Sequence, residues 1–423
     1  MSQVDASRGA GAGGSSDLGE LLAARSIVVC CGSGGVGKTT TAAALALEGA
    51  RQGRRACVVT IDPAKRLADA LGLDMLANTP RKIEGEWPGE LWAMMLDTKS
   101  TFDDLVLRYA ASRDQAEGIL RNRLYRNLSG ALSGTQEYMA MEKLYELHED
   151  GVKAGDGADG PSGPRAGGQA GAPTRFDLIV VDTPPTRNAL DFLDAPRRLT
   201  RFLDNRIFRL LVMPTRAYLK AVSIATQTFL RAVSRVVGTE VVGDAVAFFR
   251  AFEGMEQGFR DRAGRVLELL SDRHTAFVLV AAPRRDAVEE AMFFAEKLAE
   301  GQIRVETLVV NRLHPRFALP DQAAGTAPGS GSDRARGRAL AGTALGTLYD
   351  NLSQFREVAE REESHFAALV ARVAPAPVVR VPFLAADVHD IEGLDSIAGH
   401  LFGRAGASPA GNAHGRGGGG AGP

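Results

Sequence analysis

Seven runs of apolar residues recur along the chain, without the alternation of polar and apolar positions that marks a strand with one solvent-facing side. Strands of this kind are buried on both faces, which is typical of a parallel sheet covered by helices on both sides. The pattern therefore predicts an α/β fold built on a doubly wound, mainly parallel sheet. The predicted strands cover residues 26–31, 56–61, 91–96, 177–181, 276–281, 307–310 and 378–381.

Helix-forming segments separate these runs. Two long sections, at about 99–149 and 187–270, are predicted as helical subdomains that elaborate the α/β domain. The shorter predicted helices cover residues 38–52, 286–300, 345–372 and 391–402.

Glycine is unusually frequent, with 48 of 423 residues, and 27 of the 48 lie in four low-complexity segments. Such segments bury too little apolar surface to offset the entropy lost on ordering. We therefore expect disorder at residues 1–19 and 403–423, and Gly-rich loop insertions at 151–174 and 319–343. Because neither flanking block closes a plausible sheet alone, residues 20–402 are predicted to form one domain.

The balance of charges and the placement of the cysteines limit the partners and the cellular compartment that we expect. The 50 Lys and Arg residues nearly balance the 51 Asp and Glu residues, so no nucleic acid partner is expected. Cys30, Cys31 and Cys57 lie in apolar runs without a CxxC pair, which is typical of a reducing compartment. The sequence shows neither a membrane-spanning run nor the apolar core of a secretory leader, so a cytoplasmic protein is predicted.

Residues 32–39 match the phosphate-loop pattern GxxxxGK[ST] at every fixed position. The loop follows a predicted strand and opens a predicted helix, so its backbone N–H groups can surround a phosphate at the helix N-terminus. Lys38 would reach the β- and γ-phosphates of ATP, and the Thr39 hydroxyl would hold Mg²⁺. The predicted nucleotide ligands in this loop are Gly34, Gly35, Val36, Gly37, Lys38, Thr39 and Thr40.

The same letters also fit GxGxxG, through Gly32, Gly34 and Gly37, with Asp62 where a dinucleotide fold places its ribose-binding acid. A nicotinamide-dependent enzyme is therefore an alternative. A dinucleotide site has no use for Lys38 and Thr39, which favours the triphosphate interpretation.

Asp62 and Asp182 each end a predicted strand, so both carboxylates are expected at the carboxyl edge of the sheet, where ligands bind. A triphosphate hydrolase needs one carboxylate near Mg²⁺ and one group that orients the attacking water. Asp182 suits the first role and Asp62 the second. A single Asp after a strand is commonly a helix N-cap. Two such residues at the same edge of the sheet as a phosphate loop indicate a catalytic pair.

Four segments, in order, resemble the motifs of the ArsA-type ATPases: residues 34–47, 61–73, 181–196 and 309–315. A weaker similarity continues at residues 381–383. The family includes the arsenite-pump ATPase and the ATPase that targets tail-anchored membrane proteins. The resemblance implies a deviant Walker A site, Mg-ATP hydrolysis, and a dimer whose nucleotide sites face each other.

By position, the resemblance makes Asp62 the catalytic Asp of switch I and Asp182 the Asp of switch II. It also makes Asn311 a residue that recognises the base. A side-chain amide can pair with both the donor and the acceptor edge of adenine. Taken alone, an Asn after a strand is more often a turn residue.

Ser33 departs from the family pattern, which carries a second Lys at this position. In relatives that Lys reaches across the dimer to the partner's phosphates. Either a homodimer or a heterodimer with a Lys-bearing paralogue is therefore compatible with the sequence. The zinc cysteines of the targeting ATPase and paired cysteines suitable for arsenite are absent as well, so neither specific function is expected.

The expected function is an ArsA-like ATPase that couples a dimer rearrangement to an unidentified client or membrane-associated process. Residues 245–259, rich in Phe, suit either an apolar groove for a membrane-protein client or ordinary helix packing. A regulatory ATP-binding subunit is an alternative that Ser33 favours. A partition or septum-positioning ATPase is another, which the Gly-rich tail from Gly403 disfavours.

Overall fold

The computed structural model describes the chain over residues 13–62, 65–123, 125–126, 135–153, 176–183, 244, 247–248, 251, 254–315, 330–384 and 386–404.

An eight-stranded sheet forms the centre of the molecule, in the order β3-β4-β2-β5-β1-β6-β7-β8. Every strand pair is parallel except β3 with β4, which confirms the predicted doubly wound α/β fold. The strands are β1 (Ile27–Cys31), β2 (Arg55–Thr60), β3 (Arg81–Ile83), β4 (Glu90–Met95), β5 (Leu178–Asp182), β6 (Thr275–Ala281), β7 (Val305–Leu313) and β8 (Val378–Pro382).

All seven predicted strands are present, but β3 was not predicted. It has three residues, two of them exposed, and therefore shows no apolar run. It pairs antiparallel with the edge of the parallel sheet at β4.

The sheet separates two apolar layers. Successive side chains of a strand point to opposite faces. Ile27, Val29 and Cys31 of β1 accordingly join one cluster of buried residues, and Val28 and Cys30 join the other.

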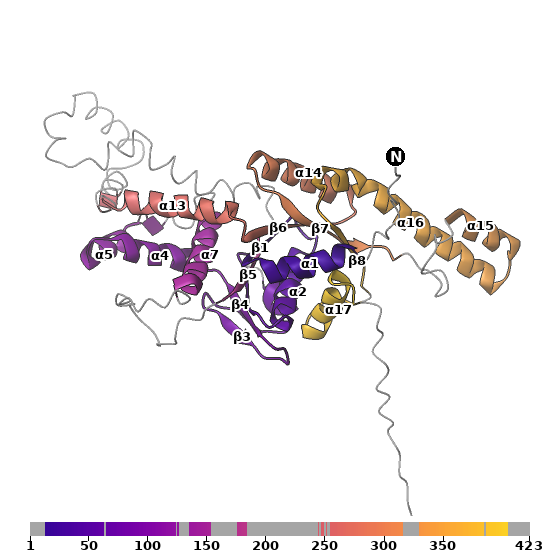
Figure 1. Cartoon of the computed structure of the whole chain (residues 1–423), viewed down its shortest axis with the longest axis horizontal. Helices are drawn as coiled ribbons and strands as arrows, with labels where there is room; N and C mark the ends of the chain where they lie inside the picture. The colour runs from indigo at the N-terminus through magenta and orange to yellow at the C-terminus, as the bar shows by residue number, and fades with distance from the viewer. Residues whose placement is uncertain are drawn as a thin grey trace, which may run out of the picture.

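Helices cover both faces of the sheet (Figure 1). One layer contains α1 (Gly13–Ala24), α2 (Lys38–Arg51), α3 (Arg66–Ala70) and α17 (Ile391–Leu401). The other contains α14 (Arg285–Glu300) and α16 (Ala344–Val373), together with a helical section beside one end of the sheet. That section consists of α4 (Thr98–Tyr109), α5 (Arg113–Arg121), α7 (Thr135–Lys153) and α13 (Glu256–Ser271).

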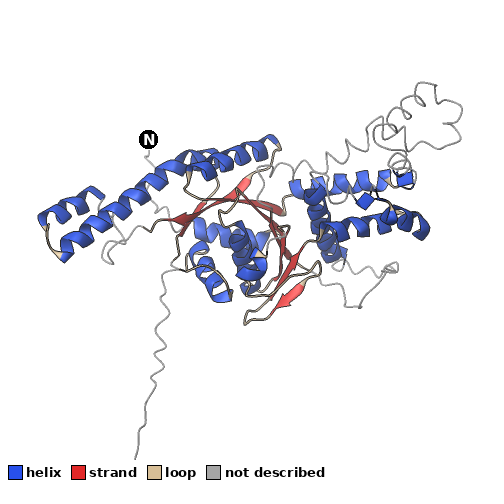
Figure 2. Ribbon diagram, turned by 180° about the vertical axis from the view of Figure 1, so that it is seen from behind, coloured by secondary structure: helices blue, strands red, loops and turns tan. Residues whose placement is uncertain are grey.

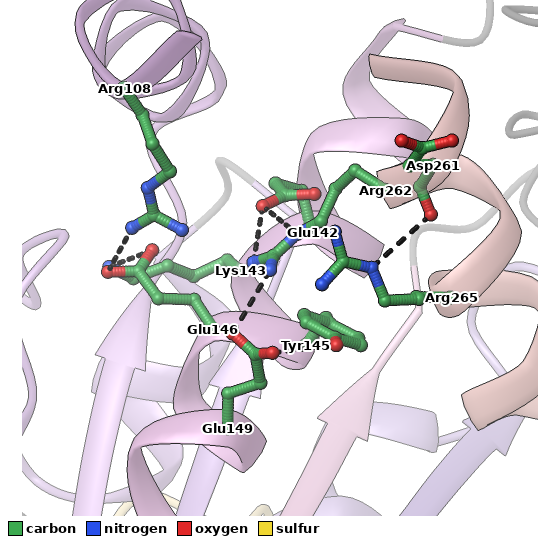
Figure 3. A network of polar contacts seen from close by, with 9 residues as sticks. All are labelled: Arg108, Glu142, Lys143, Tyr145, Glu146, Glu149, Asp261, Arg262 and Arg265. Carbon is green, nitrogen blue, oxygen red and sulfur yellow. Dashed lines mark hydrogen bonds and ion pairs between the residues drawn. The ribbon is translucent and has the colours of Figure 1, made fainter. Parts of the chain in front are cut away.

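A buried ion network joins α7 to α13 inside this helical section (Figure 3). The Arg262 Nε donates to Glu142 Oε1 at 2.7 Å, and Nη1 donates to Glu149 Oε2 at 3.1 Å. The guanidinium carbon lies 3.9 Å from the centre of the Tyr145 ring. Glu142 is 1% exposed and Arg262 is 3% exposed, so the pair is shielded from water.

Two expectations about the Gly-rich segments were wrong in part. Helix α1 begins at Gly13, inside the segment expected to be disordered up to residue 19, because Leu18 and Leu22 are fully buried against the sheet layer. Residues 330–339, expected in a loop, form α15 (Ser330–Ala339), which packs beside α16 away from the sheet (Figure 2). Asp333 of α15 forms a buried ion pair with Arg356 of α16. In both segments, packing outweighs the poor helix propensity of glycine.

Other sequence-based expectations lie outside the described residues. These are most of residues 187–270 before α13, including much of the Phe-rich segment 245–259, and the tail after residue 404. Within the described ranges, no helix combines the length and the apolar character needed to cross a membrane.

Candidate functional site

A cleft of about 650 Å³ opens at the carboxyl edge of the sheet. The phosphate loop (residues 32–39) and Asp62, both predicted from the sequence, line this cleft. The loop that follows β8 lines it as well. Its lining residues are Gly35, Gly37, Lys38, Thr39, Thr40, Asp62, Arg66, Asp69, Ala70, Thr183, Asn311, Arg312, Pro382, Phe383, Leu384, Ala386, Asp387, Val388, His389 and Ile397.

The phosphate loop needs glycine at specific positions. Gly32, Gly35 and Gly37 have φ angles of 146°, 73° and 98°, a region that L side chains rarely adopt. A Cβ on Gly32 would lie 2.0 Å from the carbonyl oxygen of Val280 on β6. The loop therefore rests directly on the neighbouring strand, and α2 begins at Lys38 with its N-terminal residues in the cleft wall.

The Lys38 side chain is buried in the loop, and its Nζ donates to the Ser33 carbonyl at 2.7 Å. Burial lowers the pKa of Lys38, and the neighbouring Asp182 carboxylate opposes this shift. The Ser33 hydroxyl is also buried and has no hydrogen-bond partner among the described residues. Ser33 therefore contributes no charge to this cleft.

Asp182 lies at the end of β5, where its Oδ2 accepts from Thr39 Oγ1 at 2.8 Å and from Thr60 Oγ1 at 2.9 Å. Burial raises the pKa of Asp182 to about 6, although the two hydroxyl donors and Lys38 act in the opposite direction. Its Oδ1 is buried without a hydrogen-bond partner in the described part of the chain.

These oxygens fit a divalent cation. Carboxylate and hydroxyl oxygens are ligands that Mg²⁺ accepts, usually alongside water and phosphate. A buried carboxylate oxygen without a partner is costly unless something binds it. Asp182 and Thr39 therefore suit a magnesium ion held between this strand end and the phosphates of a nucleotide.

Asp62 follows the last residue of β2, Thr60, by two positions, and Thr60 lies opposite Asp182 on the neighbouring strand. The Thr60 hydroxyl joins the two acids, because it donates to Asp182 and accepts from the Asp62 backbone N–H at 3.2 Å. The Asp62 carboxylate accepts from Arg66 Nη1 at 2.9 Å.

Asn311 lies near the end of β7 and contacts the phosphate loop directly. Its Nδ2 donates to the Val36 carbonyl at 2.9 Å, and its Oδ1 accepts from the Arg312 backbone N–H at 2.9 Å. A Cβ on Gly37 would lie 2.2 Å from the Asn311 amide nitrogen, so this close packing requires glycine. Asn311 thus lines the cleft, and the contacts of its amide are with the chain itself.

The structure brings Lys38, Thr39, Asp62 and Asp182 together as the sequence predicted, and it places Gly35, Gly37, Thr40 and Asn311 on the same cleft. Val36 is buried behind the loop, and Gly34 is exposed on it. The residues that follow Thr183 in the switch II segment lie outside the described part.

Sequence reasoning missed several residues that line or support this cleft. Arg66 could have been found from its spacing, since an Arg only four positions along the chain from a strand-end acid can reach it. No sequence pattern marks Thr60 as a site residue, because its contacts depend on the neighbouring strand β5. Phe383 and His389 come from loops whose paths the sequence does not define, and Arg312 follows Asn311 within β7.

Comparison with known proteins places the chain in a family. The model of the anion-transporting ATPase family matches residues 25–323. The Arabidopsis thaliana ATPase GET3B is 29% identical over 67% of this chain and 63% of its own length. The Streptomyces coelicolor protein SCO2128 is 32% identical over 69% of this chain and 63% of its own length. The arsenical pump-driving ATPase of Acidiphilium multivorum is 26% identical over 67% of this chain and 39% of its own length.

The chain thus spans less than two thirds of the length of each of these relatives. The family model nevertheless covers the phosphate loop, both strand-end acids and Asn311. The match extends over more than half of the chain and agrees with the doubly wound fold and its cleft. The chain therefore belongs to the ArsA-type family of anion-transporting ATPases.

Proposed function

We propose that this chain binds Mg-ATP in the cleft and hydrolyses its γ-phosphate bond. The observation that carries the proposal is the Oδ1 of the buried Asp182, which has no hydrogen-bond partner among the described residues, while its Oδ2 accepts from Thr39 of the phosphate loop. Relatives named as ATPases support the activity.

Each residue of the site has a distinct task in this proposal. Thr39 and Asp182 hold the magnesium ion, which neutralises phosphate charge when bound. Lys38 exchanges the Ser33 carbonyl for the β- and γ-phosphates, and the phosphate-loop N–H groups hold the β-phosphate. Asp62 orients the attacking water, and Asn311 turns its amide to the adenine edge.

The reaction is coupled to a rearrangement of a dimer that acts on an unidentified client or a membrane-associated process. The uncharged Ser33 side chain supplies no positive charge to a partner's nucleotide site. We therefore propose that the second subunit is a paralogous ATPase that carries Lys at the position equivalent to Ser33. A homodimer is the competing arrangement. Mixing the chain with such a paralogue should raise ATP turnover well above that of either chain alone, and unchanged turnover would refute the heterodimer.

A second candidate function is that of a regulatory subunit, which binds ATP and hydrolyses it weakly. Ser33 favours it, because its uncharged side chain supplies no charge to a transition state.

One comparison separates these functions. ATP binding and phosphate release are measured for the native chain, for Lys38→Ala, and for Lys99→Ala as a matched control. Lys99 is an exposed residue of α4 paired with Asp103, far from the cleft in sequence. Hydrolysis that only Lys38→Ala abolishes supports the ATPase, and binding without turnover in the native chain supports the regulatory subunit. Absence of nucleotide binding by the native chain would overturn both.

A further inference from the structure

Arg66 is a charged residue of the cleft to which neither the motifs nor the family match assigns a role. It is the first residue of the short helix α3, and it follows Asp62 by four positions. Its guanidinium donates to the Asp62 carboxylate at 2.9 Å, and both side chains line the same cleft as Lys38 and Thr39. Arg66 is therefore attached to the acid that is proposed to orient the attacking water.

The two partners of this ion pair differ in exposure. The Arg66 side chain is 58% exposed, whereas the Asp62 side chain is 11% exposed. Because the guanidinium is largely exposed to solvent, water screens its attraction to the carboxylate, and it can exchange this partner for another. The Asp62 backbone is held by the bond from its N–H to the Thr60 hydroxyl, while the Arg66 guanidinium reaches the carboxylate from solvent on a flexible stem.

A transferring phosphoryl group needs positive charge, and the Lys and Arg side chains that line the cleft in the described part of the chain are Lys38, Arg66 and Arg312. The charge on that group is spread over three oxygens in the transition state, and phosphoryl transferases counter it with metal and cationic side chains. Lys38 supplies one such cation, and Ser33 supplies none. Arg66 carries a permanent charge, with a planar fork of donors suited to two phosphate oxygens.

We propose that Arg66 is a catalytic residue that releases Asp62 when a nucleoside triphosphate binds and then contacts the γ-phosphate. The inference rests on the proposed function. Before binding, the Arg66–Asp62 ion pair occupies an acceptor oxygen of Asp62 that a water would otherwise use. Transfer of the guanidinium to the γ-phosphate removes this cation from the Asp62 carboxylate and adds positive charge where negative charge is to be stabilised.

The hydrolytic step then balances with water as the second reactant. The water oxygen forms a bond to the γ-phosphorus while the bond between that phosphorus and the β,γ-bridging oxygen breaks, and ADP leaves with the bonding electron pair. One water proton stays on the released phosphate. The other passes to solvent by way of the Asp62 carboxylate that oriented the water.

The test compares the full chain with Arg66→Ala, Arg66→Lys and the control Arg285→Ala. Arg285 also pairs with an acid four residues away, Glu289 on α14, at 2.9 Å, but both of these side chains are largely exposed and lie outside the cleft. Four quantities are measured for each protein: kcat, the KM of Mg-ATP, the Kd of Mg-ADP, and the Kd of Mg-ADP with aluminium fluoride, which imitates the transferring phosphoryl group.

Arg66→Ala should lower kcat about 100-fold or more, the effect of removing a cation from a phosphoryl-transfer site. Its Kd for Mg-ADP should change less than about threefold, because a group that acts on the γ-phosphate contributes little to binding the diphosphate. Its affinity for the aluminium fluoride complex should fall at least about tenfold. Arg66→Lys should recover only part of kcat, since a point charge does not replace the fork of donors.

A kcat for Arg66→Ala equal to or above that of the native chain, with unchanged affinity for the aluminium fluoride complex, would overturn the inference while leaving the ATPase proposal intact. A native chain that binds ATP but shows no more turnover than Lys38→Ala would also overturn it. Failure of the native chain to bind ATP would instead refute the proposed function itself.

Discussion

The ion network between α7 and α13 gives the strongest prediction about stability. Replacing Arg262 with Met keeps most of the apolar stem but removes the charge that Glu142 and Glu149 share. Glu142 is 1% exposed, and its Oε2 already has no hydrogen-bond partner within the described chain. The variant therefore leaves an uncompensated carboxylate in a buried position.

Removing one partner of a buried ion pair destabilises a protein by about 3–5 kcal/mol. Loss of the contact between Arg262 and the Tyr145 ring adds about 1 kcal/mol. We therefore expect Arg262→Met to lower the free energy of unfolding by about 4–6 kcal/mol at neutral pH. The double variant Arg262→Met, Glu142→Leu removes the isolated charge and should recover most of that loss, since buried pairs can be replaced by apolar residues at little cost.

The loss should also depend on pH in a definite direction. Burial already raises the pKa of Glu142 above its ordinary value, although Arg262 opposes the shift. Without Arg262 the folded-state pKa rises further, so the folded state binds a proton that the unfolded state releases. Folding is then favoured as pH falls toward the unfolded-state pKa, and stability is lost as pH rises.

Urea unfolding followed by circular dichroism, at acidic and neutral pH, measures these effects. Hydrogen exchange of the α7 and α13 amides locates them, because local opening of these helices should increase most. A single variant as stable as the native chain would refute the reasoning, as would a double variant less stable than the single one. Asp261→Ala, on the exposed face of α13, is the control and should change stability little.

Two further predictions concern the cleft. Thr60→Val removes the hydroxyl that joins Asp182 to Asp62, so we expect a rise in the KM of Mg-ATP and a loss of about 1–3 kcal/mol in stability from the unsatisfied groups, measured by steady-state kinetics and urea unfolding. Full activity of this variant would show that the link is dispensable. Gly32→Ala forces a Cβ against the Val280 carbonyl, so nucleotide affinity measured by fluorescence titration should fall at least about tenfold. Native affinity in this variant would contradict the loop geometry.

The sheet could be predicted because its central strands carry a clear signal. The apolar runs of β1, β5 and β6 are buried along their whole length, so nothing in them competes with the assignment. The phosphate loop has an equally clear signal, since its glycines and Lys38 occur at fixed spacing. The two acids followed from their positions after strands.

What could not be predicted depends on neighbours that are distant in the sequence. Thr60 matters because β2 and β5 are adjacent and in register, which places it opposite Asp182. Helix α15 forms where composition indicated a loop, because a buried Asp333 meets Arg356 of α16. Helix α1 was not predicted because the high glycine content of its segment indicated disorder. Its Leu18 is nevertheless buried in the apolar layer on one face of the sheet.

The central claim, that this cleft hydrolyses Mg-ATP, is tested most directly by phosphate release from the native chain and from Asp182→Asn at saturating ATP, with and without Mg²⁺. The substitution keeps the shape of the side chain, but its amide is a weaker ligand for a divalent cation. We predict Mg²⁺-dependent release by the native chain and at least about a 100-fold loss in the variant. Equal release by the two proteins, or release that does not require Mg²⁺, would contradict the account.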